Sequence, residues 1–145
     1  MRQLSTANIA ALKQYRNIGL QTGIENASPH RLIQMLLDGA LGKIAQAKGH
    51  MKADSTRKGE DISMAISIIG GLRDSLDHKA GGTIASNLDS LYEYMTYRLM
   101  ESNIKEDISI LDEVYNLLTE IKTAWDGIAN HPAASKSQSR VEPAA

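Results

Sequence analysis

Histidines are the residues of this chain whose side chains could carry a phosphoryl group or ligate a metal. There are four: His30, His50, His78 and His131. None belongs to a Glu-x-x-His or His-Glu-x-x-His pattern, in which metal ligands follow each other on one helix. His50, which lies between Lys48 and Lys52, is the candidate for phosphotransfer, but Gly49 places it at a weak helix end. We expect solvated histidines near helix ends, with a histidine phosphotransfer bundle as an alternative.

Other catalytic patterns are absent from the sequence. The 145 residues include no cysteine, so disulfides and thiolate metal sites are excluded. The glycine pairs at 70–71 and 81–82 fit neither a Walker nor a dinucleotide pattern, and no serine lies in Gly-x-Ser-x-Gly. Carboxylates such as Asp38, Asp74, Asp89 and Glu101 are scattered without a matched partner. The sequence therefore predicts a protein that is not an enzyme and has no cofactor and no metal.

The composition is that of a soluble globular domain. The chain is 42% hydrophobic and 23% charged, and its net charge of -1 argues against nucleic-acid binding. No apolar run approaches the ~18 residues of a membrane span, and the first residues lack the pattern of a secretory signal. We expect a cytoplasmic protein without membrane insertion. Because phenylalanine is absent, its core must be mainly aliphatic.

Four amphipathic helices must position any functional residue. Apolar residues recur at helical spacing from Ser28-Pro29 to about Met51, and then over about 61–76, 83–103 and 107–128. Ser28 and Pro29 suit the start of the first helix, and the glycines at 81–82 mark a stop before the third. Similar lengths and short connections predict an all-α, antiparallel four-helix bundle over 28–130. We expect a marginally helical leader over 1–27 and a disordered tail over 131–145.

The third helix carries two apolar rows instead of one. Its core row is Ile84, Leu88, Leu91, Tyr92, Met95 and Leu99. At roughly 100° per residue, Tyr94, Tyr97 and Met100 fall on another side, and Ile104 continues that row if the helix runs on. A surface helix needs one apolar stripe, so a second row requires a second surface to cover it. That surface is another part of this chain, a second copy or a different protein.

The first predicted helix contains two glycines in its interior, where glycine is destabilising relative to alanine. Gly39 and Gly42 share with Leu32 and Met35 the side away from the core stripe. Small residues beside apolar ones form a shallow trough in which a partner helix can pack, and methionine adapts to varied contacts. The alternative is that both glycines permit close packing inside the bundle, with Leu32 and Met35 at the edge of the core.

Several ordered motifs give the chain a family resemblance. The strings ASPHRLIQMLLDGA (27–40), IASNLDSLYEYMTYRL (84–99) and SNIKED (102–107), together with Trp125, resemble the flagellar export chaperone FliS family. The likeness runs from about Leu12 to Ile128. Leu37 departs from the family pattern, which often has an aromatic residue at that position.

The resemblance implies an antiparallel helical bundle in the bacterial cytosol. Such proteins bind the C-terminal segment of flagellin in surface grooves, prevent its premature polymerisation and deliver it to the flagellar type III export apparatus. The family's N-terminal segment, with a tyrosine that matches Tyr15, can cover part of the groove.

Residue pattern and resemblance together give a set of expected partner-binding residues. These are Tyr15, Leu32, Met35, Gly39, Gly42, Tyr94, Tyr97 and Met100. The expected partners are the flagellin C-terminal segment and components of the export apparatus, with a homodimer in the client-free state as a further possibility. The alternative is a structural helical module that self-associates through the row from Tyr94 to Met100 and has no client.

Overall fold

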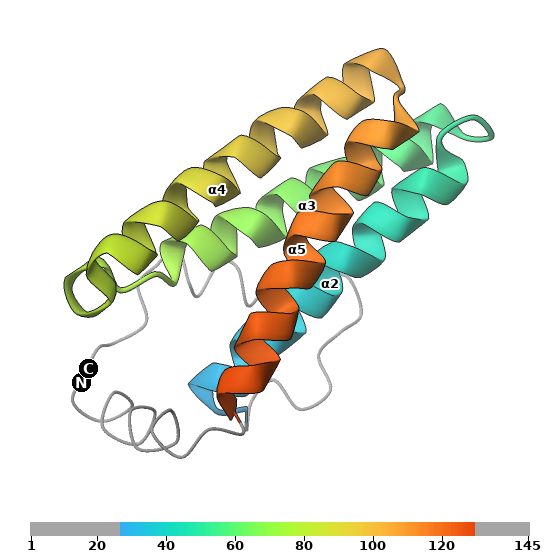
Figure 1. The fold of residues 1–145 in the computed structure, drawn as a ribbon. Coiled ribbons are helices and arrows are strands. Elements are labelled where there is room, and N and C mark those ends of the chain that lie inside the picture. The colour runs from blue at the N-terminus through green and yellow to red at the C-terminus, as the bar shows by residue number, and fades with distance from the viewer. Residues whose placement is uncertain (1–26, 130–145) are drawn as a thin grey trace.

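The computed structural model describes residues 27–129, and over this range the chain forms helices joined by short connections (Figure 1). The helices are α2 (Pro29–His50), α3 (Ser55–Asp74), α4 (His78–Lys105) and α5 (Ile108–Ala129). The predicted all-α fold is confirmed. The expected leader as far as residue 26, with Tyr15, and the expected tail lie outside the described residues.

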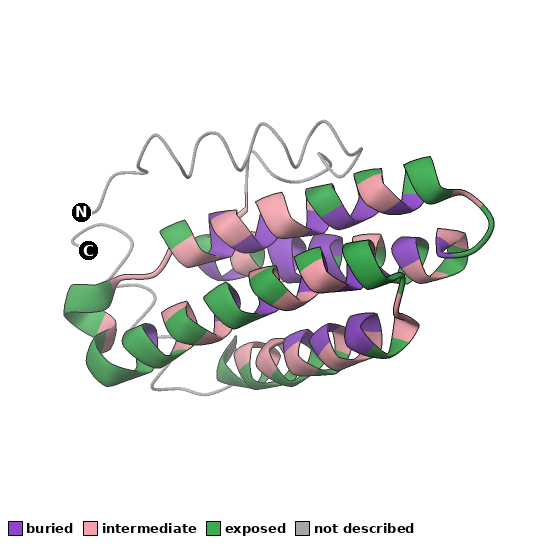
Figure 2. Cartoon of the chain, turned by 90° about the horizontal axis from the view of Figure 1, so that it is seen from above, coloured by how far each residue is buried: buried purple, intermediate pink, exposed green. Residues whose placement is uncertain are grey.

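The four helices enclose one core. Consecutive helices pack against each other, and α5 returns to α2, so each helix has two neighbours. Short connections between helices of similar length make consecutive helices antiparallel, as Figure 1 shows. Figure 2 shows the buried positions turned toward the interior. The fully buried side chains are mainly aliphatic, as expected, and include Leu37, Ile44, Ile69, Leu99 and Leu118.

Polar residues before each helix satisfy its free amide groups. The Ser28 hydroxyl accepts a hydrogen bond from the Arg31 amide at 3.1 Å, so the predicted start of α2 is confirmed. Asp54 accepts from the Arg57 amide at 3.1 Å in the same way. The helix α3 therefore begins at Ser55 and not near Asp61. The sequence placed the start too late because the first turn is polar and carries no apolar stripe.

A short helical segment precedes the expected start of the third helix. The helix α4 begins at His78, and the Asp77 carboxylate accepts from the Ala80 amide at 3.0 Å. Gly82 has a φ of 52° and a ψ of -126°, which interrupts the helical geometry, so the predicted stop at 81–82 is confirmed and the long part of α4 follows it. Ile84, expected in the core, is 72% exposed. The ion pair between Arg73 and Asp89 places the last turn of α3 beside Asp89, so the start of α4 extends past the end of α3.

The other end of α4 is fixed by a buried cation. Lys58 of α3 is only 3% exposed, and its ammonium donates to the carbonyl of Asn103 at 3.1 Å and to the Glu106 carboxylate at 3.0 Å. Glu106 has a left-handed backbone, with φ 53°, and its amide donates to the Ser102 carbonyl. A positive charge beside the last carbonyls of a helix stabilises the C-terminal end of that helix. Lys58 thereby joins α3 to the end of α4.

Candidate partner-binding surface

The outer side of α4 presents a row of large apolar side chains to solvent. Its members are Tyr94, Tyr97, Met100 and Ile104, and we call them the α4 row. Their exposed fractions range from 43% for Tyr94 to 82% for Ile104, with Tyr97 at 66%. The helix continues to Lys105, so Ile104 extends the row as the sequence predicted. Figure 2 shows exposed positions along the same helix.

The opposite side of α4 holds this row in place. Tyr92, Met95 and Leu99 are almost fully buried and belong to the hydrophobic core. Burial raises the pKa of the Tyr92 phenol to about 12, because the phenolate would be poorly solvated there. Tyr92 and Tyr97 therefore lie on the same helix in opposite environments, one in the core and one at the surface.

A polar cluster positions one end of the row. The Tyr94 hydroxyl donates to the Glu113 carboxylate of α5 at 2.6 Å, and Arg98 Nε donates to the other Glu113 oxygen at 2.7 Å. Arg98 also pairs with Glu101. The hydrogen bond between Tyr94 and Glu113 raises the pKa of Tyr94 and, with the Arg98 bond, lowers that of Glu113. The cluster ties α4 to α5 and restrains the Tyr94 ring.

The expected trough on α2 is open only in part. Met35 and Gly39 are buried, Leu32 is half-buried and Gly42 is exposed. The expectation of four accessible residues is thus corrected for Met35 and Gly39. At roughly 100° per residue both lie away from the stripe through Leu37 and Ile44, so the buried sector of α2 is wider than a single stripe suggests. Whether any of the four contacts a partner stays a prediction.

His30 corrects the expectation of solvated histidines. It is 6% exposed, and its ring stacks on Trp125 of α5 with centroids 4.7 Å apart. Neither ring nitrogen has a hydrogen-bond partner, while the backbone carbonyl of His30 accepts from the Trp125 indole at 3.0 Å. Burial lowers the pKa of His30, against a smaller opposing effect of Asp126. The pair closes the end of the bundle where α2 begins and α5 finishes.

His50, the phosphotransfer candidate, is engaged by a carboxylate. Its Nδ1 lies 2.8 Å from Oδ2 of Asp61, and Asp61 is buried. This bond occupies Nδ1, so a phosphoryl group would have to attach at Nε2, and phosphotransfer stays an alternative that the geometry does not test. His78 is exposed, as expected, and His131 lies outside the described residues.

The described part of the chain leaves large apolar side chains exposed on α4. Over residues 27–129, no group of three or more histidine, cysteine or acidic side chains could hold a metal ion. None of the described helices is long and apolar enough to cross a membrane. A helical bundle that leaves aromatic and methionine side chains uncovered is typical of proteins that recognise another chain.

Comparison with known proteins identifies the family. The sequence model of the family "Flagellar protein FliS" matches residues 11–132 of this chain. The chain therefore belongs to the FliS family. It is 50% identical over 121 residues to the flagellar secretion chaperone FliSB of Pseudomonas aeruginosa, covering 83% of this chain and 96% of that protein. It is 41% identical over 133 residues to the flagellar secretion chaperone FliS of Salmonella typhimurium, covering 90% and 97%.

Proposed function

We propose that this chain is a cytoplasmic flagellar secretion chaperone that binds the C-terminal segment of flagellin. The flagellin segment would lie against the α4 row, with Leu32 and Gly42 of α2 as further contacts. The protein would prevent premature polymerisation and deliver flagellin to the flagellar type III export apparatus. The observation that carries the proposal is the uncovered α4 row on a member of the FliS family.

The physical reasoning concerns apolar helical faces. Flagellin ends assemble by pairing helices, so covering those faces blocks assembly. A disordered segment loses conformational entropy when it binds, and burial of a large apolar surface offsets that cost. Tyrosine and methionine suit the task, since the phenol keeps a hydrated surface soluble and the thioether adapts to different side chains.

Calorimetric titration with a flagellin C-terminal segment tests this proposal. We expect Gly42→Glu to weaken binding because it places a charge on the α2 surface, where an added Cβ would meet no atom within 4 Å. Gly127→Glu on α5 is the matched control, since Gly127 is also exposed and equally unobstructed. Equal binding by both variants would remove α2 from the proposed surface, and no binding by the wild-type protein would refute the function.

A self-associating module without a client is the second candidate, because the exposed α4 row could also pair with a second copy. Sedimentation of the free protein, with and without the flagellin segment, separates the two candidates. A dimer that neither dissociates when the segment is added nor binds the segment would favour the structural module. A monomer that forms a defined complex with the segment would favour the chaperone.

A further inference from the structure

A single carboxylate of α5 holds two side chains of α4 at one end of the α4 row. Glu113 accepts a hydrogen bond from the Tyr94 hydroxyl at 2.6 Å through Oε2, and another from Arg98 Nε at 2.7 Å through Oε1. Tyr94 and Arg98 are four residues apart, so they share a side of the helix and both reach this carboxylate. Both oxygens of Glu113 are therefore engaged, and the Tyr94 hydroxyl is directed toward α5.

These hydrogen bonds connect two well-supported helices. Leu111 and Val114, which flank Glu113 in α5, are fully buried. The side chains of Glu113 and Arg98 are 36% and 28% exposed, so water competes only in part for the bond between them. Arg98 also pairs with Glu101, three residues further along α4. The core of α5 therefore fixes the carboxylate, and two anions fix the guanidinium.

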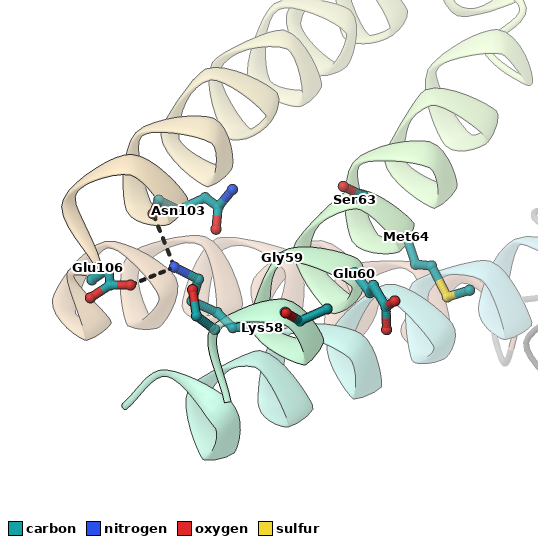
Figure 3. A pocket seen from close by; sticks show the side chains of 9 residues that line it. Lys58, Gly59, Glu60, Ser63, Met64, Asn103 and Glu106 are labelled. Carbon is teal, nitrogen blue, oxygen red and sulfur yellow. Dashed lines mark hydrogen bonds and ion pairs between the residues drawn. The ribbon is translucent and has the colours of Figure 1, made fainter. Parts of the chain in front are cut away.

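Another polar cluster on α4 acts on the helix and not on the α4 row. Figure 3 shows it at the end of α4, where the Lys58 ammonium of α3 meets the carbonyl of Asn103 and the carboxylate of Glu106. Asn103 contributes its backbone to these bonds, and Glu106 follows the last residue of the helix. Over residues 27–129, Glu113 is the residue of another helix that hydrogen-bonds a side chain of the α4 row.

We propose that Glu113 is a positioning residue of the flagellin-binding surface, which orients the Tyr94 ring before flagellin binds. This inference rests on the proposed function, because it takes the α4 row as the binding surface. An exposed tyrosine loses rotational freedom when a partner covers it, and that loss opposes binding. The bond to Glu113 removes part of the loss beforehand. Because the Tyr94 hydroxyl is already bonded, flagellin meets an apolar ring and need not supply a partner for the hydroxyl.

Calorimetric titration with the flagellin C-terminal segment tests the proposal through a double-mutant cycle. Glu113→Ala and Tyr94→Phe should each weaken binding about three- to tenfold, the range for one side chain that must be ordered on binding. The double variant should bind about as weakly as Glu113→Ala alone, because both substitutions remove the same bond. Additive losses would show that Glu113 does not act through Tyr94, and wild-type affinity in Glu113→Ala would equally overturn the proposal.

Asp112→Ala is the matched control for a general effect on the bundle. Asp112 precedes Glu113 in α5 and pairs with Lys48 of α2, so its removal also breaks an ion pair between helices but leaves the α4 row untouched. We expect Asp112→Ala to bind like the wild type. Glu113→Gln should lose less than Glu113→Ala, since the amide oxygen can still accept from Tyr94. Equal losses in Asp112→Ala and Glu113→Ala would overturn the positioning role.

NMR of ring-labelled tyrosine examines the bond in the absence of flagellin. The hydrogen bond to Glu113 raises the pKa of Tyr94, so Glu113→Ala should lower the pKa of the signal that Tyr94→Phe removes. An unchanged pKa in Glu113→Ala would overturn the proposal. Failure of the wild-type protein to bind the segment would refute the proposed function and the positioning role together. Normal wild-type binding with an unaffected Glu113→Ala variant would refute the positioning role alone.

Discussion

The two tyrosines on α4 allow a sharp test of the division between core and binding surface. Tyr97 is 66% exposed and Tyr92 is 3% exposed, although both belong to the same helix. We expect Tyr97→Ala to change stability by no more than about 0.5 kcal/mol, as is usual at exposed sites. Tyr92→Ala should cost about 3–5 kcal/mol, because removal of a buried ring leaves a cavity.

Tyr97→Ala, which should barely change stability, should have a large effect on binding. With 66% of its surface exposed, the Tyr97 side chain has about 130 Å² available for burial against a partner, given ~200 Å² for a whole ring residue. At about 25 cal/mol per Å² that area is worth ~3 kcal/mol, from which the cost of ordering the side chain must be subtracted. We therefore expect Tyr97→Ala to weaken flagellin binding by about 2 kcal/mol, or roughly 30-fold in Kd.

Thermal unfolding and calorimetric titration measure the two effects separately. Tyr92→Ala should lower the Tm by about 12–20 °C and Tyr97→Ala by about 2 °C or less, at roughly 4 °C per kcal/mol for a chain of this size. A Tyr97→Ala variant that unfolds as early as Tyr92→Ala would show that Tyr97 is part of the core. One that is stable and binds flagellin like the wild type would refute the role of the α4 row.

Three further perturbations test the fold. The pKa of His30 is lowered in the folded protein, so this side chain takes up a proton near pH 6.5 in the unfolded chain but not in the folded one. Stability against urea should therefore fall as the pH drops through 6.5. The variant His30→Phe should lose this part of the pH dependence, and an unchanged profile would contradict it. In chemical denaturation Lys58→Ala should cost about 2 kcal/mol, because it leaves the end of α4 without its cation, whereas Lys52→Ala at an exposed position should cost less than about 0.5 kcal/mol. In calorimetric melting, Gly82→Ala should destabilise the protein by about 1–3 kcal/mol, because residue 82 has a positive φ. Gly70→Ala in α3 is the control: an added Cβ there meets no atom within 4 Å, so this variant should be more stable by about 0.5–1 kcal/mol. Equal effects of the two variants would show that Gly82 is not strained.

Local chemistry sufficed to predict most of the bundle. Ser28 before Pro29 marks a helix start because a hydroxyl and a fixed φ satisfy the first turn without tertiary contacts. The apolar spacing over 107–128 predicted a buried face for α5, and Leu111, Val114 and Leu118 of that face are buried, whereas Ile128 near its end is 40% exposed. Patterns of this kind involve residues within one or two helical turns of each other, so they can be found in the sequence alone.

Positions that depend on where another helix ends were not predictable in this way. Ile84 has core spacing but projects beyond α3, and Met35 lies off the core stripe but is buried. His30 has polar neighbours in sequence, yet Trp125 covers it from the far end of the chain. Lys58 resembles any surface lysine until α4 finishes beside it.

The sequence by itself determined the four helices, their aliphatic core and the presence of a second apolar row on α4, because periodicity fixes which residues share a side of a helix. Only the tertiary structure decided which of those sides remain uncovered. Exposure depends on the relative lengths and offsets of neighbouring helices, which are set by contacts between residues far apart in the chain. Tyr97 and Ile104 remain accessible for that reason, while Met35 does not.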